Sequence, residues 1–191
     1  MMQKRLLPLL LCLCLTLCFT ACQSSGAAKK ATFDPPFSGM TWGMEPDDVL
    51  DWLGKAGLSS DLPELVPTGT NSSQIVLTPE QCAAMKFTKF AHMPVGTLYS
   101  PVTFFFTPDP AGTLHLHIIY IDVQTESKEA AAEKITSVYG EPSDINPNCW
   151  LASGKAENAA TKPFIGFFGN VSDGELTVVL NADGYVRAQF D

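Results

Sequence analysis

Two histidines two residues apart, His115 and His117, are the first candidates for chemistry. They lie in a run that predicts a β-strand, where alternate side chains project from the same face. Two imidazoles on one face could begin a metal site, which His92 or Asp122 would have to complete. No third ligand stands at a diagnostic spacing, and two polar side chains on the solvent face of the strand explain the pattern more simply. We therefore predict no metal and no other cofactor.

Other catalytic motifs are absent from the sequence. It contains no Gly-x-Ser-x-Gly, His-Glu-x-x-His, phosphate-binding loop or dinucleotide fingerprint. Neither Ser127 nor Ser153 has a neighbour that would activate it as a nucleophile. The acidic residues at 45–51 lack the spacing of a calcium loop and suit a helix N-terminus instead. The sequence predicts a protein that is not an enzyme; the alternative is a hydrolytic or metal-dependent enzyme using His115 and His117.

The cysteines are unevenly distributed. Three belong to an apolar N-terminal run, a fourth, Cys22, follows it, and the remaining two are Cys82 and Cys149. In an exported protein such a pair could form one disulfide. The closed loop of about 67 residues would then stabilise the fold by roughly 4 kcal/mol. Two separate buried thiols are the alternative, because the pairing depends on geometry that the sequence does not contain.

The first 21 residues have the layout of a secretion signal. Basic residues at 4–5 precede an apolar run at 6–19, and a small residue stands directly before Cys22. The run is shorter than the about 20 residues that a membrane span needs. The block Phe19-Thr20-Ala21-Cys22 resembles the lipobox of bacterial lipoproteins, which implies cleavage after residue 21 and diacylation of Cys22. An uncleaved anchor helix and a cleaved but unlipidated signal are the alternatives.

The rest of the chain divides into a linker and one domain. Residues 22–32 contain no large apolar side chain, which predicts a flexible tether between the lipidated cysteine and a domain at 33–191. The protein is then extracytoplasmic and anchored by lipid to the bacterial cell membrane or outer membrane. Its formal net charge of −8 becomes more negative when the basic signal residues are removed. This balance disfavours nucleic acid as a partner, because phosphate contacts need clustered Lys and Arg.

Hydrophobic spacing and capping residues predict the elements that position these side chains. Helices are expected at 46–53, 79–85 and 127–139. Strands are expected at 75–77, 87–92, 102–106, 114–123, 163–168, 176–181 and 185–190. Asp-Gly turns at 172–174 and 182–184 join the last three strands, and 58–73 is expected to be a loop. This order predicts an α+β domain, with an antiparallel sheet and helices packed on one face.

The same pattern predicts the core. We expect burial of Trp42, Leu53, Phe104, Ile118, Ile135 and Trp150. Within 114–123, alternation places Leu114, Leu116, Ile118 and Tyr120 on one face of the strand.

Three consecutive aromatic residues, Phe104, Phe105 and Phe106, cannot share one strand face. If both faces of the sheet are covered, all three belong to the core, which is the favoured interpretation. If one face is open, an aromatic patch on it would suit a protein or peptide partner.

Short motifs add a family resemblance. Trp42-Gly43-Met44 stands before the first helix, Tyr139-Gly140-Glu141-Pro142 follows the longest one, and Trp150 lies in the next strand. This pattern resembles small exported bacterial lipoproteins built from α/β-meander repeats, similar to the β-lactamase inhibitor protein-like fold and to small outer-membrane assembly lipoproteins. The resemblance implies a fold of two related halves, with helices packed on an antiparallel sheet. Together with the tether, the single domain and the absent catalytic motifs, it favours a non-enzymatic module that binds an envelope protein or peptide. No inhibitory or assembly residue of those families carries over to this sequence.

Overall fold

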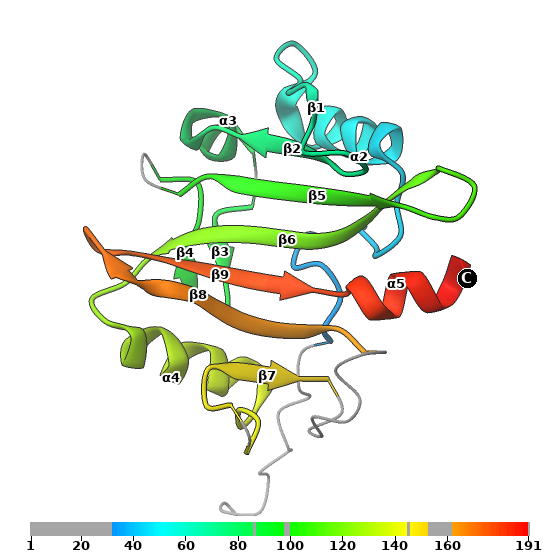
Figure 1. Cartoon of the computed structure of the whole chain (residues 1–191). Coiled ribbons are helices and arrows are strands. Elements are labelled where there is room, and N and C mark those ends of the chain that lie inside the picture. The colour runs from blue at the N-terminus through cyan, green and yellow to red at the C-terminus, as the bar shows by residue number, and fades with distance from the viewer. Residues whose placement is uncertain (1–31, 86, 98–99, 145, 153–161, 191) are drawn as a thin grey trace, which may run out of the picture. The chain divides into compact units, whose positions relative to one another are not determined.

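A seven-stranded antiparallel sheet forms the centre of the part of the chain that the structure describes. The structure is a computed structural model that describes residues 32–85, 87–97, 100–144, 146–152 and 162–190, which belong to one unit, Ala31–Asp191. In the order β1-β2-β5-β6-β9-β8-β7 (Figure 1), the strands are Leu65–Pro67, Ser73–Leu77, Val102–Pro108, Leu114–Gln124, Glu175–Asn181, Phe164–Ser172 and Cys149–Leu151. The predicted signal, Cys22 and all of the tether except residue 32 lie outside the described residues.

The strand order divides into two halves that meet at the centre of the sheet. β1, β2, β5 and β6 follow one another across one half, and β7, β8 and β9 follow one another across the other. β6 and β9 pair antiparallel, from Ile118 opposite Asn181 to Gln124 opposite Glu175. One helix precedes the strands of each half, α2 (Pro46–Leu53) and α4 (Lys128–Tyr139). The arrangement confirms the predicted α+β class with an antiparallel sheet.

Local signals start the helices where the sequence predicts them. Pro46 occupies the first turn of α2, where its missing N–H costs no hydrogen bond, and Asp47 faces the positive end of the helix dipole. α3 (Pro79–Ala84) begins with a capping box. The Thr78 hydroxyl accepts the backbone N–H of Gln81, and the Gln81 side-chain oxygen accepts that of Thr78. A wider helical turn, η1 (Gly54–Leu58), extends α2.

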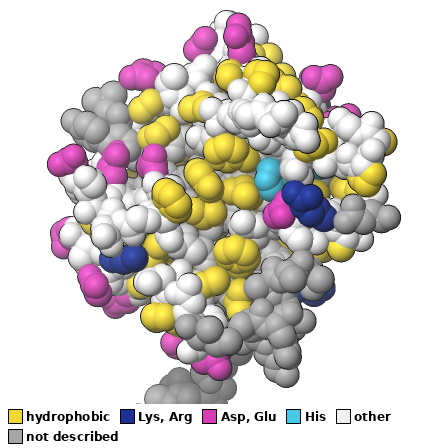
Figure 2. Space-filling view, in the orientation of Figure 1, with side chains coloured by type: hydrophobic (Ala, Val, Ile, Leu, Met, Phe, Trp, Pro, Cys, Tyr) yellow, Lys and Arg dark blue, Asp and Glu magenta, His cyan; other side chains and the backbone are white. Residues whose placement is uncertain are grey.

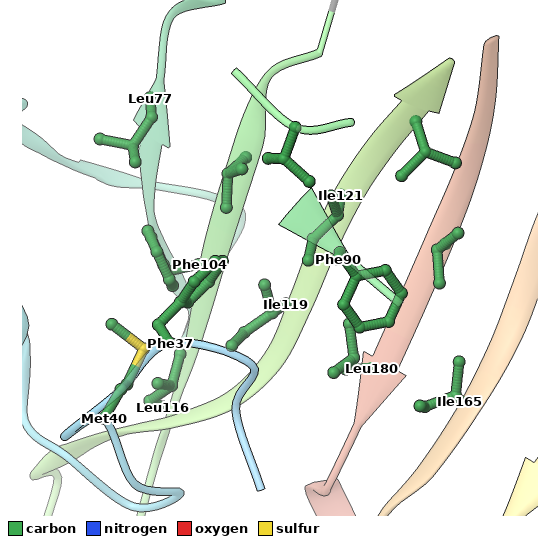
Figure 3. Close-up of a cluster of buried hydrophobic side chains, with 14 of the residues drawn as sticks. Phe37, Met40, Leu77, Phe90, Phe104, Leu116, Ile119, Ile121, Ile165 and Leu180 are labelled. Atoms are coloured by element: carbon green, nitrogen blue, oxygen red, sulfur yellow. The ribbon is translucent and has the colours of Figure 1, made fainter. Parts of the chain in front are cut away.

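The core lies between one face of the main sheet and the elements that cover it. Helices α2 and α4 contribute Val49, Leu53, Ala131 and Ile135, all fully buried. Figure 3 shows that Phe104, Ile119 and Leu180 of the sheet point into the same apolar cluster as Phe90. A side chain of this size contributes about 1.5–3 kcal/mol when it is fully removed from water. The predicted burial of Trp42, Leu53, Phe104, Ile135 and Trp150 is confirmed.

The predicted burial of Ile118 is wrong, because β6 contains a bulge. Phe105 pairs with Ile118 and Phe106 pairs with Leu116, so His117 has no opposite residue. The extra residue reverses the alternation along the strand. Leu116 therefore faces the core together with Ile119 and Ile121, while Ile118 and Tyr120 face away from it and are only half-buried.

The last predicted strand, 185–190, is also wrong, because the chain ends in helix α5 (Asp183–Phe190). The Asn181 side-chain oxygen accepts the backbone N–H of Asp183 at the start of this helix. One turn later, Nε of Arg187 donates to both carboxylate oxygens of Asp183 at 2.9 and 3.0 Å. The Asp-Gly pair at 183–184 is thus a first helical turn. The other pair, Asp173-Gly174, has positive φ at both residues and connects β8 to β9 as predicted.

Two shorter segments also differ from the sequence prediction. The segment 58–73, predicted as a loop, contains the edge strand β1, whose three residues are all exposed and so show no alternation. The strand predicted at 87–92 is a small hairpin of β3 (Lys89–Phe90) and β4 (Met93–Pro94). Its turn is formed by Ala91 and His92, both at positive φ. This hairpin packs against β6 on the core side, behind β6 and β9 in Figure 1.

Candidate functional site

The two candidate histidines are buried, with 5 % of His115 and 9 % of His117 exposed, so they are not the solvent-facing pair that simple alternation predicts. Both nitrogens of His115 have an acceptor within reach. Nδ1 lies 3.0 Å from the carbonyl oxygen of Gly43, and Nε2 lies 3.3 Å from Oδ2 of Asp109. The Phe190 ring of α5 stacks on the imidazole, with ring centroids 3.8 Å apart.

These contacts leave His115 unsuited to acid–base catalysis. A doubly protonated ring donates to both acceptors, whereas a neutral ring can donate to only one of them. In either state each nitrogen faces a protein oxygen, so neither is directed toward a substrate. Asp109 is itself fixed, because its Oδ1 accepts the backbone N–H groups of Ala111 and Thr113. The Thr113 N–H, together with His115, holds the pKa of Asp109 below its ordinary value.

A pocket of about 400 Å³ lies beside this pair, between the β5–β6 loop and α5. Arg187 lines it, but its guanidinium already bonds Asp183, and Nη2 lies 3.4 Å from the Thr107 hydroxyl oxygen. His117 adjoins this network: burial is the main cause that lowers its pKa, and the nearby charge of Asp183 opposes that shift. The pocket therefore contains side chains that are mostly bonded to one another.

The residues proposed to complete a metal site are not near the histidines. His92 is exposed on the β3–β4 turn, on the core side of the sheet. Asp122 lies on β6 five residues beyond His117, about 17 Å along an extended strand, and it accepts a hydrogen bond from the Thr177 hydroxyl. Within the described ranges, no group of three or more His, Cys, Asp or Glu residues could hold a metal ion.

The two cysteines of the domain are free thiols in the structure, Cys82 buried and Cys149 half-buried. Cys82 lies on α3, which packs beside β2, and Cys149 lies on β7 at the far edge of the sheet. The Cys82 thiol contacts the backbone of Val102 on β5, and four strand spacings, about 19 Å, separate β5 from β7. A disulfide needs Cα atoms within about 7 Å. Burial raises the pKa of Cys82 to about 12.

The second candidate site is the face of the main sheet that points away from the core, here called the open face. Figure 1 views the sheet from this side, and Figure 2 shows hydrophobic side chains gathered at its centre. Strand register defines its members, because directly opposite residues share a face. One row joins Val76, Thr103, Tyr120 and Val179, and the next joins Gln74, Phe105, Ile118, Asn181 and Phe164. Every one of these residues is half-buried or exposed.

Three rings on the open face form what we call the aromatic stripe: Phe105, Tyr120 and Phe168. The Phe105 and Tyr120 centroids are 4.8 Å apart, and the Tyr120 and Phe168 centroids are 6.2 Å apart with nearly parallel planes. Phe168 is 66 % exposed, the largest exposure among the described large apolar side chains. The Tyr120 hydroxyl has no hydrogen-bond partner among the described residues. The stripe thus offers contiguous apolar surface and one hydroxyl that no described residue hydrogen-bonds.

Three carboxylates lie at the Phe168 end of the aromatic stripe, and we call them the acidic corner: Asp122, Asp173 and Glu175. Asp122 stands in the same row as Thr177 and Phe168, and Glu175 stands in the next row. Oε1 of Glu175 is buried without a hydrogen-bond partner in the described part of the chain. Burial first, and then the charges of Asp122 and Asp173, raise the pKa of Glu175.

Sequence reasoning identified only part of this site. The run of three phenylalanines pointed to Phe105, although the favoured prediction placed it in the core. Phe168 was missed, yet the adjacent pair Phe167-Phe168 gave the same signal, since neighbours on a strand face opposite sides. Tyr120 was placed on the core face because the bulge at His117 leaves no mark in the sequence.

No protein-family model matches the chain, and no curated protein or solved structure matches it either. The resemblance to α/β-meander lipoproteins therefore stays a prediction from short motifs. Across the described residues, no helix is long and apolar enough to cross a membrane.

Proposed function

We propose that the protein is a lipid-anchored extracytoplasmic lipoprotein whose domain binds an envelope protein or peptide through the aromatic stripe. The observation that carries this proposal is the open face itself, where Phe105, Tyr120 and Phe168 form contiguous aromatic surface. Exposed apolar patches that are contiguous mark interaction sites, whereas scattered apolar residues do not. Tyr and Phe rings also supply large contact area for little loss of side-chain entropy, which is why aromatic residues dominate interface cores.

A binding role fits the remainder of the described domain better than catalysis. Nothing in the described residues points to a catalytic group: His115 is bonded on both sides, and the candidate metal ligands are dispersed. The net charge of −8 favours solubility and disfavours anionic partners such as nucleic acid.

The anchor in this proposal is Cys22. The ten residues from 23 to 32 can span at most about 35 Å when fully extended, so the domain would work close to the membrane surface. Fatty-acid labelling of cells tests the anchor. The wild-type chain should incorporate label, and Cys22→Ser should not. Label that persists in Cys22→Ser would remove the lipid anchor from the proposal.

Site-specific photocrosslinking tests the binding surface. A photoreactive phenylalanine analogue replaces Phe168 in the full-length anchored chain, and the same analogue replaces Leu62 as a matched control. Leu62 is also an exposed apolar residue, at 45 %, but it lies between η1 and β1, away from the aromatic stripe.

The position-168 probe should give a reproducible adduct with one envelope protein, and the position-62 probe should not. Tyr120→Ala should reduce that adduct by about tenfold, since a central aromatic anchor is worth more than 1 kcal/mol. Identical adducts from both positions, or turnover of a small substrate without any partner, would contradict a binding role for this face.

A further inference from the structure

The acidic corner determines what chemistry a partner of the aromatic stripe must bring. Antiparallel register places Asp122, Thr177 and Phe168 side by side across β6, β9 and β8. Glu175 follows on the same face, and Asp173 belongs to the β8–β9 turn beside it. The carboxylates therefore adjoin the most exposed ring of the stripe.

No cation within the described part of the chain neutralises these carboxylates. Among the described residues, none of the three forms an ion pair with Lys, Arg or His. Lys128 of α4 contacts β8 instead: its Nζ donates to the carbonyl oxygen of Gly169 at 3.2 Å and lies 5.9 Å from the Phe167 ring centroid. Phe167 faces the core side, where it packs against Trp150.

Repulsion among the carboxylates of the acidic corner is unfavourable, and a cation bound there would reduce it. Burial and two neighbouring carboxylates raise the pKa of Glu175, which shows that its ionised form is disfavoured in the folded domain. A Lys or Arg side chain placed there would offset the negative charge and supply the donor that Oε1 of Glu175 lacks.

We infer that the partner segment carries a basic side chain, Lys or Arg, immediately beside an aromatic or branched apolar one. The apolar group packs on Tyr120 and Phe168, and the cation reaches Asp122 and Glu175. This inference rests on the proposed binding role of the open face and specifies its ligand class.

A second copy of this chain does not supply that chemistry through the same face. None of the strand residues on the open face is Lys or Arg, so stripe-to-stripe pairing would bring aromatic rings together without a cation. An anionic lipid surface would be repelled by the corner.

Peptide selection on the full-length chain in detergent tests the inference. A displayed library of random nine-residue peptides is panned on the wild-type protein, and the enriched sequences are synthesised. Their affinities are then measured for the wild type, for Asp122→Asn with Glu175→Gln, for Phe168→Ala, and for Asp47→Asn with Asp48→Asn. The last pair is the matched control, because it removes two exposed carboxylates from α2 at the same cost in net charge.

The expected result is enrichment of Lys or Arg next to an aromatic or branched apolar residue. Affinity should fall about tenfold or more in the acidic-corner variant and in Phe168→Ala, and stay within about twofold in the α2 control. It should also fall between 50 and 500 mM salt, where the screening length shortens from about 14 to about 4 Å.

Three results would overturn the inference. Peptides that need Phe168 but contain no basic residue would refute the ligand class and leave the binding role intact. Absence of any peptide that depends on Phe168 would refute both. Sedimentation showing self-association that Phe168→Ala abolishes would assign the face to a second copy of the chain.

Discussion

Two phenylalanines on opposite faces of the sheet allow the open face to be tested by stability alone. Phe104 is fully buried in the core, and truncation of such a ring to alanine costs about 3–5 kcal/mol. Phe168 is 66 % exposed, so its truncation removes at most about a third of a full transfer term of 1.5–3 kcal/mol. The same chemical change is therefore expected to cost at most about 1 kcal/mol on the open face.

Unfolding of the full-length chain in urea, followed by tryptophan fluorescence, measures both free energies. For a domain of this size, 1 kcal/mol corresponds to about 2–4 °C in the midpoint of thermal unfolding. Phe104→Ala should thus lower the midpoint by about 6–20 °C, and Phe168→Ala by no more than about 4 °C. An unchanged urea slope is the control that the variants unfold from the same native state. A Phe168→Ala cost equal to that of Phe104→Ala would show that the face is covered and would refute the binding surface.

The ionisable groups and cysteines give further expectations. The pKa of Asp109 is lowered in the folded state, so its stabilisation is present above the ordinary Asp pKa and is lost as pH falls through the lowered value. Melting curves should show Asp109→Asn less stable than wild type at pH 7 and the gap closing in acid; a gap that does not change with pH would contradict this. The pKa of Glu175 is raised, so its charge destabilises the fold above that raised value, and Glu175→Gln should be more stable than wild type at pH 7 but not near pH 3. A variant less stable at pH 7 would show that the carboxylate is satisfied. Cys82 is buried with its pKa raised to about 12, so a thiol reagent should modify it only after unfolding; modification in the native state, or no free thiol in the unfolded chain, would contradict the separate-thiol arrangement.

The parts of the fold that follow from local signals were predictable. The capping box at Thr78 and Gln81 and the proline at the start of α2 each act within one turn of backbone, and the helices begin where those residues stand. The Asp173-Gly174 turn is equally local. These local signals act independently of the rest of the chain, so the sequence alone reveals them.

The sequence predictions are wrong where contacts between residues far apart in the sequence determine the local structure. The final segment is helix α5, whose Phe190 packs on His115 of β6, a residue far away in the sequence. The bulge at His117 depends on the register between β5 and β6, and it reverses which side of β6 faces the core. The candidate site depends on the same bulge, because the bulge places Tyr120 on the open face.

The central pairing of β6 with β9 also has a consequence for how the chain folds. The two strands come from segments far apart in sequence, with Asp122 and its partner Thr177 separated by 55 positions. Pairs with such separation form late, because loop closure costs entropy before contacts offset it. Since synthesis proceeds from the N-terminus, β6 is complete while β9 does not yet exist. For that interval β6 presents an unpaired edge carrying Ile119, Ile121 and Val123, which is the kind of strand that templates aggregation. We expect misassembled chains to associate through this edge of β6. The place where the two halves of the sheet meet is therefore the part of the fold that most needs protection from aggregation during synthesis.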